Sequence, residues 1–221
     1  MDHLQITGGS IIRTSECESL LSEVRYSFNN PGELKEKLSG AGWENGNWSY
    51  FRRFSSDAQL FTLGAGLALR DSRIKFIPEQ TAGLLVADDF EHESDQAAYF
   101  DDYVKGGRYL GRSSLFVHTL PTSAAVDASV CLGLRGPLLY IRDEDDIWGG
   151  LLNAAEDFIS RGDAEIMLLA YRRGAAMICL TLSAGGSAAL CRTAQAEPEA
   201  IFESARQQSK EKANANTADL K

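Results

Sequence analysis

The most constraining feature of this sequence is the stretch from residue 116 to residue 165, where helix and strand patterns alternate closely. Residues 123–132 are rich in small side chains and stop at Gly133, a pattern typical of a glycine-terminated helix. The apolar run at 138–141 then predicts a short strand, and residues 147–160 predict an amphipathic helix. The apolar run at 165–171 predicts a second, buried strand. This order favours an α/β layered fold.

The corner between the 138–141 strand and the 147–160 helix carries four consecutive carboxylates, Asp-Glu-Asp-Asp at 143–146. In many α/β enzymes such a corner holds a nucleophile, because a helix N-terminus stabilises negative charge. Here no cysteine or serine is present. The carboxylates could form a solvated helix cap, or one with a raised pKa could act as a general acid or base. Four adjacent acids favour the cap.

The rest of the chain completes the layered pattern. Residues 4–13 predict a first strand interrupted by a bulge or turn at Gly8-Gly9, since no phosphate-binding glycine motif follows. Ser55-Ser56-Asp57 caps a predicted helix that runs to about residue 71. The run at 81–87 predicts a buried parallel strand, and 165–171 with 175–182 predicts a hairpin. We therefore expect a mixed, mostly parallel sheet with helices on both faces.

Composition excludes several functions. The net charge of −9 argues against nucleic acid and anionic membrane as partners. No apolar run approaches the roughly 20 residues of a membrane span, and the first residues lack the order of a signal peptide, so we expect a cytoplasmic protein. The four scattered cysteines predict reduced thiols, with Cys131 and Cys179 in the core. The acids and histidine at 88–95 fit no metal motif, so neither metal nor cofactor is expected.

Several segments resemble motifs of β-ketoacyl synthases, in the same order. Residues 120–125, LPTSAA, resemble that family's L-P-N-x-x-A, and residues 132–137, LGLRGP, resemble its l-G-l-x-G-P. Residues 154–165 resemble the helix and strand start that follow, and weaker similarity covers 51–71 and 81–87. The resemblance spans roughly residues 1–183. It implies the N-terminal half only of a thiolase-like fold, as a domain at 1–195 followed by a polar tail at 196–221 that is partly helical or disordered.

The same resemblance implies a nucleophilic cysteine eight residues after Pro137, but that position holds Asp145. A carboxylate cannot form the acyl thioester on which condensation depends, so we expect no catalytic residue. The histidines that assist the family's reaction belong to a C-terminal half that this chain does not reach. The protein looks like a chain-length-factor subunit, similar to the short ones that accompany aryl-polyene-type ketosynthases. We therefore expect a heterodimer with a catalytic β-ketoacyl synthase subunit, and contact with acyl carrier protein only indirectly through that subunit.

The resemblance also implies an interface and a substrate pocket. The family dimerises through the strand before the nucleophile, which here comprises Leu138, Leu139, Tyr140, Ile141 and Arg142. An acyl pocket opens at that interface, and its lining here would be Tyr99, Phe100, Ile147, Trp148 and Leu151.

Two questions stay open from the sequence. The protein could instead be a stand-alone pseudo-ketosynthase homodimer, or an acyl-thioester decarboxylase or hydrolase that uses the acidic corner. The aromatic residues Trp43, Trp48, Tyr50 and Phe51 could form a ligand or partner surface, although we favour a role in pinning their loop onto the body.

Overall fold

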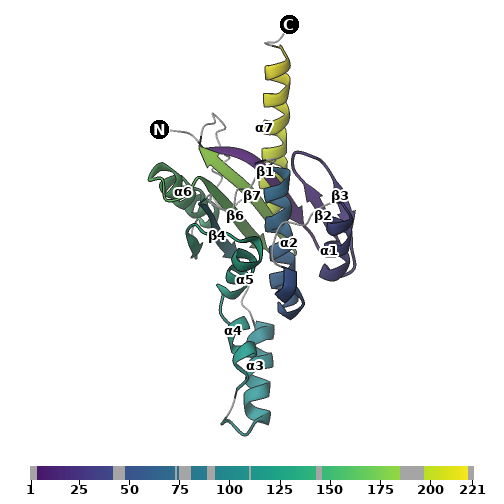
Figure 1. The fold of residues 1–221 in the computed structure, drawn as a ribbon, viewed down its shortest axis with the longest axis vertical. Coiled ribbons are helices and arrows are strands. Elements are labelled where there is room, and N and C mark those ends of the chain that lie inside the picture. Colours follow the sequence, from purple (N-terminus) through teal and green to yellow (C-terminus); the bar gives the residue numbers. More distant parts are fainter. Residues whose placement is uncertain are drawn as a thin grey trace.

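The computed structural model describes residues 4–41, 48–72, 74, 81–88, 93–109, 111–142, 146–184 and 197–218. These residues form seven strands, seven α-helices and one 3₁₀-helix, shown in Figure 1. In chain order they are β1 (Leu4–Ile12), β2 (Glu16–Ser19), β3 (Arg25–Ser27), α1 (Pro31–Gly40), η1 (Trp48–Arg53), α2 (Ser56–Asp71), β4 (Ala82–Asp88), α3 (Glu93–Lys105), α4 (Ser113–His118), α5 (Ser123–Leu132), β5 (Leu138–Tyr140), α6 (Ile147–Ser160), β6 (Ile166–Arg173), β7 (Ala176–Ala184) and α7 (Pro198–Ala218).

All seven strands belong to one sheet in the order β3-β2-β1-β7-β6-β4-β5. Strand β4 pairs in parallel with both β5 and β6, whereas the other four pairings are antiparallel. The α/β class is confirmed, but the expectation of a mostly parallel sheet is wrong. The reason is that β1, β2 and β3 form a meander and β6 and β7 a hairpin, and short connections of this kind join antiparallel strands.

Helices cover both faces of the sheet, as the sequence predicted (Figure 1). Along β6, Leu168 and Ala170 belong to the core under α1, α2 and α5. Met167, Leu169 and Tyr171 alternate with them and belong to the core under α6 and α7. This two-residue alternation is the pleat of a strand buried on both sides.

In the central helix–turn–strand–helix unit, α5 and α6 have the predicted bounds, and β5 ends one residue before the predicted end at 141. Helix α5 ends at Gly133, which has a left-handed φ of 68°. In the turn that follows, a Cβ on Gly136 would lie 2.6 Å from the Ala82 carbonyl carbon, so only glycine lets this turn contact β4. At the start of α6, the Asp146 side chain accepts a hydrogen bond of 2.9 Å from the Gly149 amide. The cap interpretation is thus confirmed for Asp146.

The glycine pair in β1 forms the predicted bulge, because the register with β7 shifts between Ile6 and Gly8. A Cβ on Gly8 would lie 2.3 Å from the Ser72 amide nitrogen at the end of α2. Next to this contact, the buried Asp71 carboxylate accepts hydrogen bonds from the backbone amides of Gly9, Leu21 and Ser22 and from the Ser22 hydroxyl. Asp71 therefore joins α2 to both β1 and the β2–β3 turn.

The aromatic residues after α1 pin their segment onto the body. Phe51 is buried, and Trp48 packs against the same core with its ring centroid 5.2 Å from that of Phe51. The Lys35 ammonium lies over both rings, at 5.5 and 5.1 Å. The pinning interpretation is confirmed for these two residues. Tyr50 is exposed, and Trp43 lies outside the described residues.

Helix α7 makes up most of the polar tail, which the sequence predicted to be partly helical or disordered, and it continues to Ala218. Ile201 and Phe202 are buried against the sheet beside α6. The Arg206 guanidinium pairs with the buried Glu18 carboxylate of β2, which holds the helix on the meander. The predicted domain boundary at 195 stays a prediction, because residues 185–196 lie outside the described residues.

Candidate functional site

Strand β5 lies at one edge of the sheet. It pairs with β4 through the register Leu84↔Leu138, Leu85↔Leu139 and Val86↔Tyr140, and among the described strands none pairs with its other side. Leu139 is 44% exposed. Ile141 follows half-buried against the core below α6, and Arg142 is exposed. An exposed edge of this kind offers unpaired backbone groups to another chain, so the geometry suits the predicted interface.

Exposed apolar side chains are concentrated in the segment of the chain that leads to this edge. Among the described residues, eleven large apolar side chains are exposed, and nine of them lie between residues 100 and 139. Helix α5 buries Ala125 and Ala128 but turns Val126 and Val130 outward. We call these nine residues the apolar face: Phe100, Val104, Tyr109, Phe116, Val117, Leu120, Val126, Val130 and Leu139. Such a concentration marks an interaction surface.

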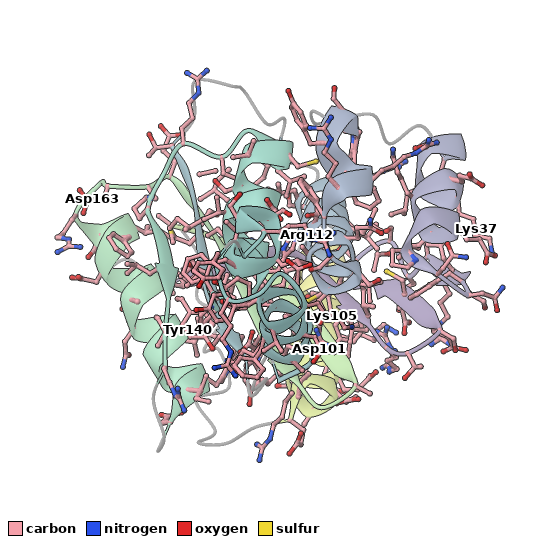
Figure 2. All side chains as sticks on the ribbon, turned by 90° about the horizontal axis from the view of Figure 1, so that it is seen from below. Lys37, Asp101, Lys105, Arg112, Tyr140 and Asp163 are labelled. Carbon is pink, nitrogen blue, oxygen red and sulfur yellow. The ribbon has the colours of Figure 1, made fainter. Side chains whose placement is uncertain are left out.

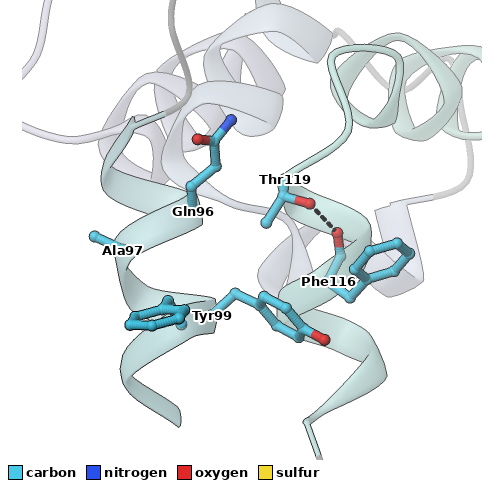
Figure 3. A pocket seen from close by; sticks show the side chains of 6 residues that line it. Gln96, Ala97, Tyr99, Phe116 and Thr119 are labelled. Atoms are coloured by element: carbon cyan, nitrogen blue, oxygen red, sulfur yellow. Dashed lines mark hydrogen bonds between the residues drawn. The ribbon is translucent and has the colours of Figure 1, made fainter. Parts of the chain in front are cut away.

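A cavity of about 550 Å³ opens between α3 and α4 (Figure 3). Its lining comprises Gln96, Ala97, Tyr99, Phe100, Phe116 and Thr119. The Tyr99 ring lies 5.6 Å from the Phe116 ring, centroid to centroid. The Thr119 hydroxyl donates a 2.7 Å hydrogen bond to the Phe116 carbonyl oxygen, so this polar side chain is already paired with the backbone. The aromatic lining and the volume suit an apolar ligand.

Tyr99 and Phe100 line this cavity, whereas the α6 residues named for the predicted pocket do not. Trp148 and Leu151 are fully buried between α6 and the sheet, with the Trp148 ring 6.1 Å from that of Tyr171. Ile147 packs against the same core. The structure does not bring these three to the α3–α4 cavity, because the apolar stripe of α6 faces its own sheet. Instead Phe116 and Thr119, which sequence reasoning did not single out, line it.

An ion pair closes the hairpin between α3 and α4. The Arg112 guanidinium donates hydrogen bonds of 2.9 and 2.6 Å to one Asp102 carboxylate oxygen, and the Arg112 amide donates to the other oxygen. Arg112 thereby holds the pKa of the Asp102 carboxyl below its ordinary value. Figure 2 shows Arg112 with Lys105 and Asp101 on the α3–α4 side of the molecule.

The ends of the parallel strands carry polar side chains. The Tyr140 hydroxyl donates a 2.7 Å hydrogen bond to the Asp88 carboxylate, and Arg172, in register with Asp88, pairs with Asp57 at 3.0 Å. Asp145 and its neighbours at 143–144 lie outside the described residues, as do residues 89–92 of the acidic segment at 88–95. The role of Asp145 therefore stays a prediction.

The described thiols are poor nucleophiles. Burial raises the pKa of Cys17 to about 12 and that of Cys131 to about 11, and it raises the pKa of Cys179 as well. Cys191 lies outside the described residues. Within the described part of the chain, no three metal-ligating side chains gather at one place. None of the helices that can be described is both long and apolar enough to cross a membrane.

Comparison with solved structures identifies the fold. One chain of a ketosynthase in complex with its chain length factor (ApeO and ApeC), from Xenorhabdus doucetiae, matches with a TM-score of 0.56 at 12% identity, over 95% of this chain and 92% of that chain. A chain of AntDE:AntF, a type II PKS acyl-carrier protein in complex with its ketosynthase, matches with a TM-score of 0.56 at 15% identity. The ishigamide ketosynthase/chain length factor matches with a TM-score of 0.54 at 10% identity.

This chain therefore has the thiolase-like fold of ketosynthases, as its motifs suggested. The alignments cover 83% and 84% of this chain but only 63% of the AntDE:AntF chain and of the ishigamide chain. At these identities the likeness shows the fold alone. No family model matches the sequence, and no curated protein matches it either.

Proposed function

We propose that this protein is a non-catalytic, chain-length-factor-like subunit that pairs with an active β-ketoacyl synthase in fatty-acid or polyketide biosynthesis of the aryl-polyene type. The observation that carries this proposal is the apolar face, which lies in the segment of the chain that leads to the open edge strand β5, on a ketosynthase-like fold. In this proposal the segment Leu138–Arg142 pairs with the partner subunit, and Tyr99 and Phe100 shape the acyl pocket.

The chemistry supports a partner rather than a catalyst. Asp145 occupies the position that the motif spacing assigns to the nucleophile, and a carboxylate cannot carry the acyl thioester. None of the three cysteines in the described residues is exposed, so none of them replaces the missing thiol. The net charge of −9 would repel an acidic carrier protein, which is why we assign carrier docking to the catalytic subunit.

The first experiment is co-expression with a ketosynthase encoded next to this protein, followed by co-purification and mass measurement. We expect a one-to-one complex. Leu139→Lys should abolish it, because a charge would be buried in the interface. The matched control is Val24→Lys, since Val24 is 39% exposed and lies beside β3 at the opposite edge of the sheet. If both variants bind like the wild type, β5 is not the interface.

A second experiment tests the pocket. In an active complex, Tyr99→Ala and Phe100→Ala should change the length of the acyl product, whereas Tyr50→Ala, an exposed aromatic outside the apolar face, should not. Unchanged product in both pocket variants would remove these residues from the pocket.

The same measurements separate the alternatives. A homodimer that ignores the ketosynthase would favour a stand-alone pseudo-ketosynthase. Thioester turnover by the protein alone that is lost in Asp145→Asn would favour a decarboxylase or hydrolase.

A further inference from the structure

Helices α3 and α4 project from the body as an arm, whose described residues are 93–109 and 111–120 (Figure 1). Of the side chains described between residues 95 and 120, none is buried. Helix α6, of similar length to α3, buries Trp148, Leu151, Leu152 and Ala155 in the core. The arm therefore contributes nothing to either core, although it carries six residues of the apolar face.

The contacts within the arm are weak. Helix α3 has 13 residues and α4 has six, lengths at which an isolated helix is marginal in water. The Tyr99 ring contacts the Tyr103 ring along α3 and the Phe116 ring across the hairpin, but all three residues stay partly in solvent. The Asp102–Arg112 pair is exposed on its arginine side, and such pairs contribute little to stability. An element with few buried contacts opens at low cost, so the free arm belongs to the least stable part of this molecule.

The position of the arm indicates what covers it. Along the chain, its exposed side chains Phe116, Val117 and Leu120 lead directly into Val126 and Val130 of α5, and α5 leads to edge strand β5. Helix α4 contacts α5, and α5 contacts β5. A subunit that docks on β5 and α5 would therefore lie next to the apolar side chains of the arm.

We propose that the arm is a second contact surface for the subunit that docks on β5, that docking orders it, and that this ordering assembles the cavity between Tyr99 and Phe116. This inference rests on the proposed function. The cavity is built only from arm residues, so any condition that opens the arm removes it. An acyl chain in the cavity and a partner on the apolar face both favour the ordered arm. Their affinities are therefore coupled, and reciprocally so.

Amide hydrogen exchange of the full chain, alone and with the ketosynthase, tests the ordering. In the free protein, arm amides should exchange about a hundredfold or more faster than those of the buried hairpin β6–β7, and the complex should slow them about tenfold or more. An arm as protected as β6–β7 in the free protein overturns the inference. A complex in which arm exchange is unchanged overturns it too, while leaving the proposed function standing. If no complex forms, the proposed function fails and the inference fails with it.

Two neighbouring acids on α3 provide matched variants. Asp102→Ala removes the pair that closes the arm, whereas Asp101→Ala removes only an exposed pair with Lys105 at 3.7 Å. We expect Asp102→Ala to weaken the affinity for the ketosynthase about threefold to tenfold with unchanged melting of the body, and Asp101→Ala to leave the affinity unchanged. Equal effects of the two substitutions would contradict the coupling.

A fluorescent fatty acid, cis-parinaric acid, tests the cavity. The complex should bind it about tenfold more tightly than the free protein does, and Phe116→Ala should abolish that difference. Equal affinity of the free protein and the complex would overturn the assembly of the cavity on docking.

Discussion

The buried carboxylate of Asp71 provides the sharpest test of how this fold is held together. It is 4% exposed and lies at the end of α2. One oxygen accepts hydrogen bonds from the Gly9 amide at 3.0 Å and the Leu21 amide at 2.8 Å. The other accepts from the Ser22 amide at 2.9 Å and the Ser22 hydroxyl at 2.8 Å. Asp71→Ala removes all four acceptor contacts at once.

The expected loss follows from the three backbone donors. The buried Gly9 amide, left without an acceptor, costs about 1–3 kcal/mol, and the two partly buried amides, which water can reach, cost about 0.5–1.5 kcal/mol each. Asp71→Ala should therefore lower the free energy of unfolding by about 4 kcal/mol, a large share of the roughly 5–15 kcal/mol of a typical domain. Asp71→Asn keeps one acceptor oxygen and should lose about half as much.

Urea unfolding, followed by far-ultraviolet circular dichroism, measures these differences. Asp157→Ala is the control, because Asp157 is exposed on α6 and pairs only at the surface with Arg161. Such pairs contribute roughly 0–1 kcal/mol. The reasoning is refuted if Asp71→Ala and Asp157→Ala unfold at the same urea concentration.

Three further predictions concern other contacts. Gly136→Ala should lower the free energy of unfolding by about 1–3 kcal/mol, because the new Cβ would overlap the backbone of β4. Gly40→Ala should leave the free energy of unfolding unchanged, because a Cβ there would meet no atom within 4 Å. Urea unfolding measures both. Arg206→Ala should lower the free energy of unfolding by about 1–3 kcal/mol and make α7 sensitive to protease, because the helix loses its ion pair with Glu18. An α7 as resistant to protease as in the wild type would contradict this anchoring. At pH 8 the raised thiol pKa values keep the described cysteines protonated, so Ellman's reagent should modify them only after unfolding. Peptide mapping identifies the modified residues. Modification of Cys17, Cys131 or Cys179 in the native protein would show that their burial is incomplete.

The elements predicted from sequence are those whose signals are local. Helix α5 ends where Gly133 supplies a left-handed residue, and α6 begins where Asp146 supplies a cap. The sequence predicts that β4 is buried because its residues from Ala82 to Ala87 are apolar. The turn of the β6–β7 hairpin is predicted by Gly174, which has a positive φ. In each case the residues that decide the structure are neighbours in the chain, so a single sequence contains the information.

The elements that were missed depend on distant partners. Residues 16–19, ECES, carry no apolar alternation, yet they form β2 because β1 on one side and β3 on the other satisfy their backbone groups. Phe116 and Val117 look like core residues by type, and only the structure shows that they stay exposed on α4. For the same reason the sequence could propose Trp148 for the pocket, since a helix pattern does not say which surface its apolar stripe meets.

The pairing of β1 with β7 has a consequence for the order of folding. Residues 4–12 lie in the interior of the sheet, but their neighbours on one side, residues 177–184, are synthesised much later. The separation is 180 positions for the pair Leu4 and Ala184 and 165 positions for the pair Ile12 and Met177. During synthesis β1 can first form only its meander with β2 and β3, and its other edge stays unpaired until β7 has been made. Contacts of such long range slow folding and leave an unpaired strand exposed to other chains meanwhile. Strand β1, which is synthesised before the other six strands of this sheet, is therefore among the last to complete its pairing.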